Sequence, residues 1–97
     1  MNSQNIRGEI YSLPLEVEQI GQDIIGPIKF QGASKLKIEA EGEGNVIVSL
    51  LSVDGQTLDL LVNEIWPYEA STVLTHTGPA IVYVETSGKW RVTISDL

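Results

Sequence analysis

The chain has 97 residues, of which 42% are hydrophobic, and a formal net charge of −7 from 13 acidic and six basic side chains. This length predicts one domain over residues 1–97, in which we expect the polar residues 1–8 to be flexible. The acidic balance argues against nucleic acid and anionic membranes as partners, which are bound through basic patches, and the lack of cysteine excludes disulfides, thiolate metal sites and a cysteine nucleophile.

Short segments in which apolar and polar residues alternate run along the whole chain, with the period expected of half-buried β-strands. In chain order they are residues 9–13, 15–20, 23–31, 34–41, 46–53, 56–62, 71–77, 80–86 and 89–95. Gly26-Pro27 indicates an edge strand or a bend, because proline donates no hydrogen bond to a ladder. About eight short strands at intervals of roughly ten residues favour an all-β fold, an antiparallel β-sandwich or jelly roll.

The turn signals predict how some of these strands connect. Ala80–Ser95 reads as a β-hairpin with Ser87-Gly88 as its two-residue turn, and Asp54-Gly55 is a second hairpin signal. Gly78-Pro79 is expected to be a turn as well. On the last strand Trp90 lies in phase with the apolar residues, so we predict that it is in the core.

The order of signals in the second half of the chain resembles a known kind of module. A Gly-rich loop at Glu41–Asn45 precedes a strand and an Asp-Gly turn at Val46–Gly55; an LLVNEI-x-PY segment at Leu60–Tyr68 and a Gly-x-Trp-x-Val-x-Ile strand at Gly88–Ile94 follow. These signals are similar to those of an accessory β-sandwich module of bacterial secreted, lipid-anchored or membrane-tethered proteins. The resemblance implies a non-catalytic domain that pads, displays or binds, although Trp66 stands where the family pattern has glycine.

The ends of the chain and its hydropathy bear on location. The N-terminus lacks a charged flank followed by an apolar core, so no signal peptide is expected. No apolar run reaches the ~20 residues of a membrane span, and membrane insertion is not expected. The chain as written is then expected to be cytoplasmic, or extracytoplasmic if it is a module of a longer secreted protein.

The connection Asn63–Ala70 is the candidate binding site. Other connections are short and rich in Gly, Ser, Asp or Pro, whereas this one carries large apolar and aromatic residues around a proline. Exposed aromatic rings can fill a partner's pocket or stack on a sugar ring. The predicted binding residues are Asn63, Glu64, Ile65, Trp66 and Tyr68. The competing interpretation is that Trp66 or Tyr68 folds back to cap one open end of the core.

Catalytic and metal-binding interpretations depend on isolated residues. His76 can be named in a Ser-His-Asp triple, but no G-x-S-x-G elbow supports it, and an ordinary strand-end histidine is the favoured interpretation. Glu39, Glu41 and Glu43 could offer oxygens to Ca²⁺, or could form a solvated acidic loop, since they lack the spacing of a dedicated calcium loop. The carboxylates that could pair for glycoside hydrolysis are Glu16, Glu18, Asp54 and Asp59.

The sequence therefore favours a non-enzymatic structural or protein-interaction module, with self-association as one mode of action. The alternative is a carbohydrate-binding module that uses exposed Trp66 and Tyr68, and a third interpretation is a small hydrolase around His76. No catalytic residue, metal ligand or cofactor is predicted. The expected partners are a protein, a second copy of the chain or a carbohydrate.

Overall fold

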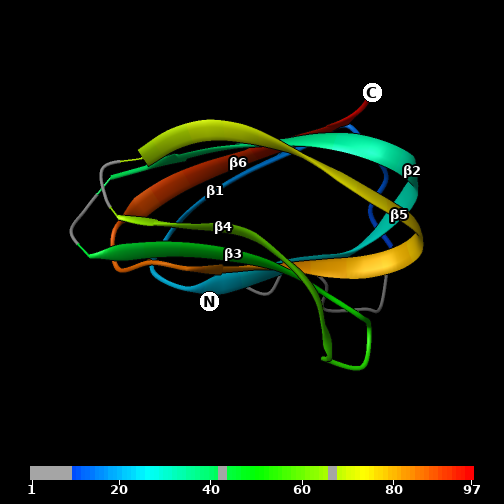
Figure 1. Ribbon diagram of the computed structural model, residues 1–97, viewed down its shortest axis with the longest axis horizontal. Helices are drawn as coiled ribbons and strands as arrows, with labels where there is room; N and C mark the ends of the chain where they lie inside the picture. Colours follow the sequence, from blue (N-terminus) through cyan, green and yellow to red (C-terminus); the bar gives the residue numbers. More distant parts are fainter. Residues whose placement is uncertain (1–9, 42–43, 66–67) are drawn as a thin grey trace.

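The computed structural model describes residues 10–41, 44–65 and 68–97, and within these residues the chain forms strands and no helix (Figure 1). The strands are β1 (Leu15–Ile20), β2 (Asp23–Ala40), β3 (Asn45–Leu51), β4 (Thr57–Ile65), β5 (Tyr68–Glu85) and β6 (Lys89–Asp96). They form one antiparallel sheet in the order β1-β6-β2-β5-β3-β4. The prediction of an all-β antiparallel domain is confirmed at this level.

Two strands of 18 residues each, β2 and β5, pair with each other in the middle of the strand order. Residues 34–40 of β2 also pair with β6, while residues 81–85 of β5 also pair with β3. Figure 1 shows both long strands curving round at one end of the molecule, so that the two parts of the sheet lie over each other. We call these parts the first half-sheet (β1, β6 and residues 34–40 and 68–74) and the second half-sheet (β3, β4 and residues 23–28 and 80–85).

The described residues form six strands where the sequence predicted about eight. The predicted turn at Gly78-Pro79 lies inside β5, and the predicted strands 23–31 and 34–41 are continuous in β2. Gly32 pairs with His76 and Gly78 pairs with Phe30, so the two glycines lie on opposite strands of the β2–β5 ladder, with only the Gln31–Thr77 pair between them. Their φ angles are 123° and 103°, values that an L side chain rarely adopts. At these positions glycine lets the backbone bend while the ladder continues, instead of ending the strand.

The predicted hairpin over Ala80–Ser95 is wrong. The strand that ends at Glu85 pairs with β2 and β3, whereas β6 pairs with β1 and β2, so β5 and β6 are not neighbours. Ser87-Gly88 instead carries the chain from the second half-sheet to the first. The Gly21-Gln22 connection between β1 and β2 makes the opposite crossing at the same end, where the Gly21 N–H donates a hydrogen bond of 3.0 Å to the Gly88 carbonyl oxygen.

The hairpin predicted at Asp54-Gly55 is confirmed. β3 and β4 pair antiparallel on either side of it, and Gly55 has a φ of 96°. The Gly55 N–H donates to the Ser52 carbonyl oxygen at 2.9 Å, which closes the turn. Here the local signal suffices, because both strands belong to the same half-sheet.

One cluster of buried aliphatic and aromatic side chains, contributed by β2 to β6, fills the space between the half-sheets. Trp90 is its largest member and is 1% exposed, which confirms its predicted place in the core. The indole N–H of Trp90 donates a hydrogen bond of 2.7 Å to the Gly21 carbonyl oxygen. Trp90 therefore packs the core and holds the β1–β2 crossing at the same time.

The edge of β2 in the second half-sheet is covered by a short extended segment. The Tyr11 N–H donates to the Pro27 carbonyl oxygen, and the Lys29 N–H donates to the Tyr11 carbonyl oxygen, both at 2.9 Å. The ladder between β2 and β5 is irregular here, with a register shift between Ile25 and Ile28. This agrees with the prediction that Gly26-Pro27 marks an edge or a bend.

We predict that Trp90→Ala costs about 3–5 kcal/mol in the free energy of unfolding, the range for truncating a large buried aromatic side chain. Urea unfolding followed by circular dichroism measures this change. Ile20→Ala is the matched control, because Ile20 is exposed and surface changes usually stay within about 0.5 kcal/mol. A Trp90→Ala protein as stable as the control would contradict the core assignment.

Candidate functional site

The predicted binding segment lies mostly at the end of an edge strand. Asn63, Glu64 and Ile65 are the last three residues of β4 and all are exposed, with the Ile65 side chain 73% exposed. Trp66 lies outside the described residues. Tyr68 begins β5, and its side chain also lies outside the described part. The structure thus brings three of the five predicted residues together on one exposed strand end.

The predicted long connection over residues 63–70 is shorter than expected. β4 continues to Ile65 through its pairing with β3, and β5 begins at Tyr68 opposite Ala40 of β2. Only residues 66–67 separate the two strands. Most of this segment is therefore strand, which explains why its sequence lacks the Gly, Ser and Asp residues typical of turns.

The apolar phase of β4 also departs from simple alternation, which would place Leu58, Leu60 and Val62 on one face. Val62 is buried, whereas Leu58 and Leu60 are 47% and 52% exposed. The cause is a register shift at which Val48 pairs with Val62 and the next residue of β3 pairs with Leu60. The extra residue reverses the phase, so two leucines face solvent on an edge strand.

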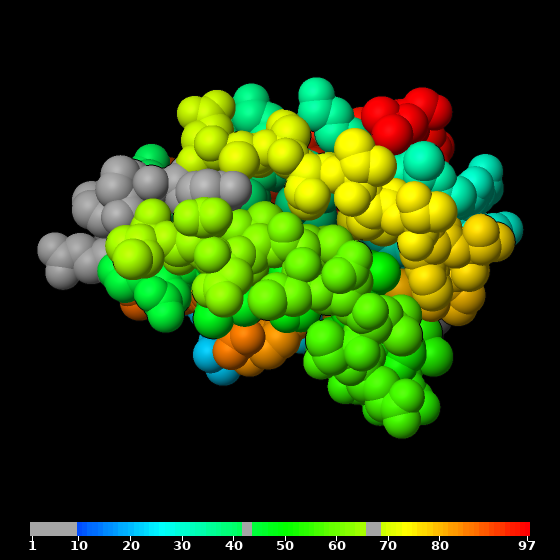
Figure 2. All heavy atoms as spheres, viewed as in Figure 1, coloured from blue at the N-terminus to red at the C-terminus, as the bar shows by residue number. Residues whose placement is uncertain are grey.

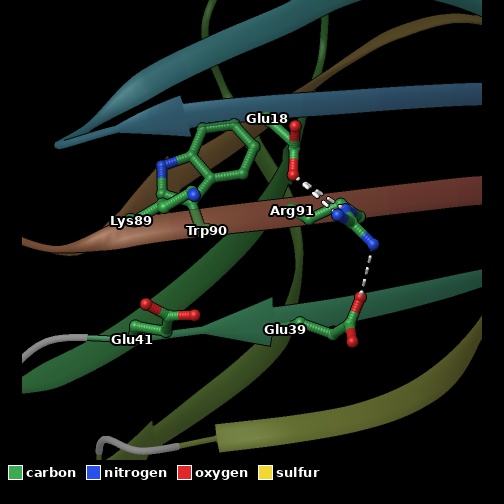
Figure 3. Close-up of a pocket in the computed structure, with 6 residues that line it drawn as sticks. All are labelled: Glu18, Glu39, Glu41, Lys89, Trp90 and Arg91. Atoms are coloured by element: carbon green, nitrogen blue, oxygen red, sulfur yellow. Dashed lines mark hydrogen bonds and ion pairs between the residues drawn. The ribbon is translucent and has the colours of Figure 1, made fainter.

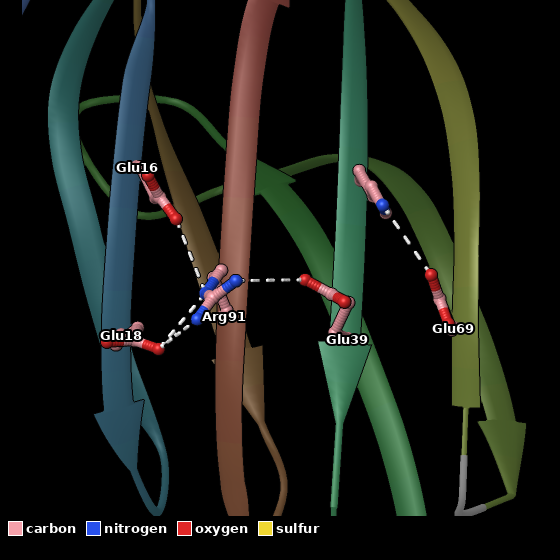
Figure 4. Close-up of polar contacts among 6 residues, drawn as sticks. Glu16, Glu18, Glu39, Glu69 and Arg91 are labelled. Carbon is pink, nitrogen blue, oxygen red and sulfur yellow. Dashed lines mark hydrogen bonds and ion pairs between the residues drawn. The ribbon is translucent and has the colours of Figure 1, made fainter.

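The outer surface of the first half-sheet carries an ion-pair network centred on Arg91 (Figure 4). Arg91 donates hydrogen bonds of 3.0 Å and 2.8 Å from Nε and Nη2 to one carboxylate oxygen of Glu18. Its guanidinium also lies 3.3 Å from Glu16 and 3.6 Å from Glu39. These contacts tie β1 and β2 to the strand between them, although exposed pairs of this kind each contribute little to stability.

The network controls the ionisation of Glu18. The hydrogen bond from Arg91, and then its positive charge, lowers the pKa of Glu18 below the ordinary value, and the same carboxylate raises the pKa of Arg91. A general acid for glycoside hydrolysis needs the opposite shift. Asp59 lies on β4, at the other end of the strand order, and Asp54 lies in the turn before it. The four carboxylates named from the sequence are therefore not gathered into one site.

Two shallow hollows lie on the face of the first half-sheet. The first, of about 120 Å³, is lined by Glu18, Glu39, Glu41, Lys89, Trp90 and Arg91 (Figure 3). The second, of about 290 Å³, includes Lys35, Thr93 and Ser95. Their linings offer charges and hydroxyls, which suit a polar ligand. The one aromatic ring, that of Trp90, is almost wholly buried and offers no stacking surface.

His76 lies inside β5 and not at a strand end as predicted. It is half-buried, pairs with Gly32, and its ring meets the ring of Phe30 edge-on with centroids 6.0 Å apart. Within the described part of the chain, no hydrogen bond joins His76 to a serine or an aspartate. The ring therefore packs against an aromatic neighbour, with no triad geometry around it.

The acidic loop is only partly within the described residues. Glu43 lies outside them, Glu39 is drawn to Arg91, and Glu41 lines the smaller hollow. Among residues 10–41, 44–65 and 68–97, no group of three or more His, Cys, Asp or Glu side chains could hold a metal ion. The same residues include no helix of the length and hydrophobicity needed to cross a membrane.

Comparison with known proteins returns no match, either in a scan against protein-family models or in a search of the curated proteins. The functional interpretation therefore rests on the residues of this chain. Sequence reasoning missed the Arg91 network. The signal for it was that the polar faces of residues 15–20, 34–41 and 89–95 carry charges of opposite sign. Only the strand order shows that these faces are adjacent.

We predict that Arg91→Gln returns the pKa of Glu18 towards its ordinary value. Because the folded-state pKa of Glu18 is lowered, the pair stabilises the fold above the unfolded-state pKa, and this contribution is lost as the pH falls through the folded-state pKa. NMR titration of the Glu18 carboxyl carbon measures the shift. Lys35→Gln is the control, since no ion pair of Lys35 is found among the described contacts. An unchanged Glu18 pKa in Arg91→Gln would contradict the assigned cause.

Proposed function

We propose that this chain is a non-catalytic module of jelly-roll type that binds a protein partner through residues 63–68, which begin at the exposed end of β4. Several features support the finer fold. Each long strand contributes one segment to each half-sheet, so both half-sheets have four segments, in the orders β1-β6-β2-β5 and β4-β3-β5-β2. The chain crosses between the half-sheets at Gly21-Gln22, at residues 86–88 and within both long strands, as jelly rolls do. The accessory β-sandwich resemblance belongs to the same proposal.

The observation that carries the function is the exposure of Ile65. A strand that ends with a side chain of this size 73% exposed leaves apolar surface for a partner to cover. Trp66 follows directly in the sequence, and Trp is the residue type most often found as the anchor of an interface. Pro67 limits the backbone freedom that binding would otherwise remove. An exposed aliphatic residue followed in the sequence by an aromatic residue and a proline is thus the candidate anchor.

Carbohydrate binding remains the second candidate, and the larger hollow on the first half-sheet favours it. Lys35, Thr93 and Ser95 there offer donors and acceptors of the kind that bind sugar hydroxyls. This hollow lies on the first half-sheet, whereas Ile65 belongs to the second. The two candidates therefore make different predictions for substitutions on each face.

We predict that Trp66→Ala changes the stability by under about 1 kcal/mol, as at surface sites, and weakens binding by about 2 kcal/mol or more. Sedimentation velocity tests binding to a second copy, and a glycan array tests binding to sugars. Val73→Ser is the control, because Val73 is an exposed apolar residue on β5, at the edge of the first half-sheet and outside the proposed site. If the Trp66→Ala protein is unfolded, and the wild type is monomeric and binds nothing, Trp66 is a core residue and the proposed site is wrong.

We also predict no turnover in a screen of esterase, glycosidase and phosphatase substrates. The reason is that the one histidine packs against Phe30 and the paired carboxylates are held by a guanidinium. The screen is run on the wild type and on His76→Ala. Turnover that disappears in His76→Ala would contradict the non-catalytic proposal.

A further inference from the structure

β4 is an open edge of the sheet. It is the last strand in the order, and in the described part of the chain its backbone pairs only with β3. Figure 2 shows the β4 residues lying open on the front face of the molecule, next to those of β3. An edge strand presents a row of unpaired N–H and C=O groups, to which an extended segment can add as a further strand.

The other edges differ from β4 in how they are occupied or neutralised. The edge of β2 is covered by Tyr11, whose backbone donates one hydrogen bond to β2 and accepts one from it. The acids on β1 are held by Arg91, and Glu69 on β5 lies 3.5 Å from Lys37. On β4, by contrast, no ion pair is found for Asp59 or Glu64 within the described residues.

The charge around β4 is of one sign. The sequence has no lysine or arginine from residue 38 to residue 88, a stretch that includes all of β3, β4 and β5. The basic residues of the described part lie only in β2 and β6. A second copy of β4 would bring more acids to the shared edge and no bases. Charge complementarity therefore selects a basic partner over a second copy.

The two faces of β4 offer different chemistry to an added strand. Asp59 pairs with Leu50, and Glu64 pairs with Val46. Leu50 and Val46 are buried, so the two acids lie on the core-directed phase at the rim of the sheet. Leu60, which pairs with Ser49, lies on the outer phase and is half exposed. A strand beside β4 would thus meet carboxylates on one face and aliphatic side chains on the other.

We propose that β4 binds an extended segment of alternating basic and aliphatic residues by β-strand addition. The segment's backbone would pair with the free edge of β4, its basic side chains would meet Asp59 and Glu64, and its aliphatic side chains would cover Leu60. This inference rests on the proposed function, because it gives the partner of the same surface its chemistry. It extends the binding surface from residues 63–68 along the whole of Thr57–Ile65.

The test is an NMR titration of ¹⁵N-labelled protein with peptides of nine residues, the length of β4. The probe alternates lysine and valine, a second peptide alternates glutamate and valine, and a third is the lysine–valine peptide with N-methyl groups on alternate residues. We expect saturable shifts at the amides of β3 and β4 with the first peptide alone. N-methylation should abolish binding, because it removes the N–H groups that pair with the edge.

A charge exchange tests the side chains. The double variant Asp59→Lys, Glu64→Lys should lose at least tenfold in affinity for the lysine–valine peptide and bind the glutamate–valine peptide instead. Asp96→Lys is the matched control, because this exposed acid lies at the end of β6 and makes no ion pair among the described contacts. It should change the affinity less than twofold. Circular dichroism checks that each variant is folded.

Several outcomes would overturn strand addition. They are no binding of the lysine–valine peptide, equal binding of both charge patterns, unchanged binding after N-methylation, shifts confined to the Arg91 face, and dimerisation of the protein alone through β4. The two proposals fail separately. If Trp66→Ala removes an interaction while the charge exchange changes nothing, the site at residues 63–68 stands and strand addition is wrong. If only the charge exchange acts, the edge of β4 is the surface and the Trp66 anchor is wrong.

Discussion

The pairing of β2 with β5 is the interaction on which the rest of the structure depends. It runs from Asp23 opposite Val84 to Ala40 opposite Tyr68, so one ladder belongs to both half-sheets. The glycines at positions 32 and 78 let this ladder bend without a break, since their positive φ angles are closed to most other residues. Once the ladder is bent, the apolar faces of the two half-sheets meet and every other strand takes its place beside it.

The crossings at the opposite end complete the arrangement. The chain passes between the half-sheets at Gly21-Gln22 and at Ser87-Gly88, and a backbone hydrogen bond joins the two connections. The indole of Trp90 lies beneath them and donates to Gly21. A single buried side chain therefore couples core packing to the path of the chain, which is why its loss should cost more than its apolar area alone would indicate.

The two half-sheets present different surfaces, and this difference shapes the functional argument. On the first, carboxylates from β1 and β2 surround Arg91, so opposite charges satisfy each other within the chain. On the second, Asp59 and Glu64 lie on the edge strand β4, and β3, β4 and β5 contain no lysine or arginine. A surface whose charges are already paired gains little from binding a partner. The edge of β4 has unpaired backbone groups for an added strand, and its negative charge and exposed Leu60 favour a basic, aliphatic segment.

The sequence by itself determined that the domain is all-β and which segments are extended, because alternation depends only on which side chains each residue carries. It also determined the core position of Trp90 and the turn at Asp54-Gly55, where both strands lie in one half-sheet. Only the tertiary structure decided that Gly32 and Gly78 bend a ladder. In the sequence, a glycine that ends a strand at a turn looks the same as a glycine that bends a continuous strand. It also decided that Arg91 meets Glu18, 73 residues away, and that Asn63–Ile65 is the end of an edge strand. Such contacts depend on which strands become neighbours when apolar faces are buried, and no local pattern contains that choice.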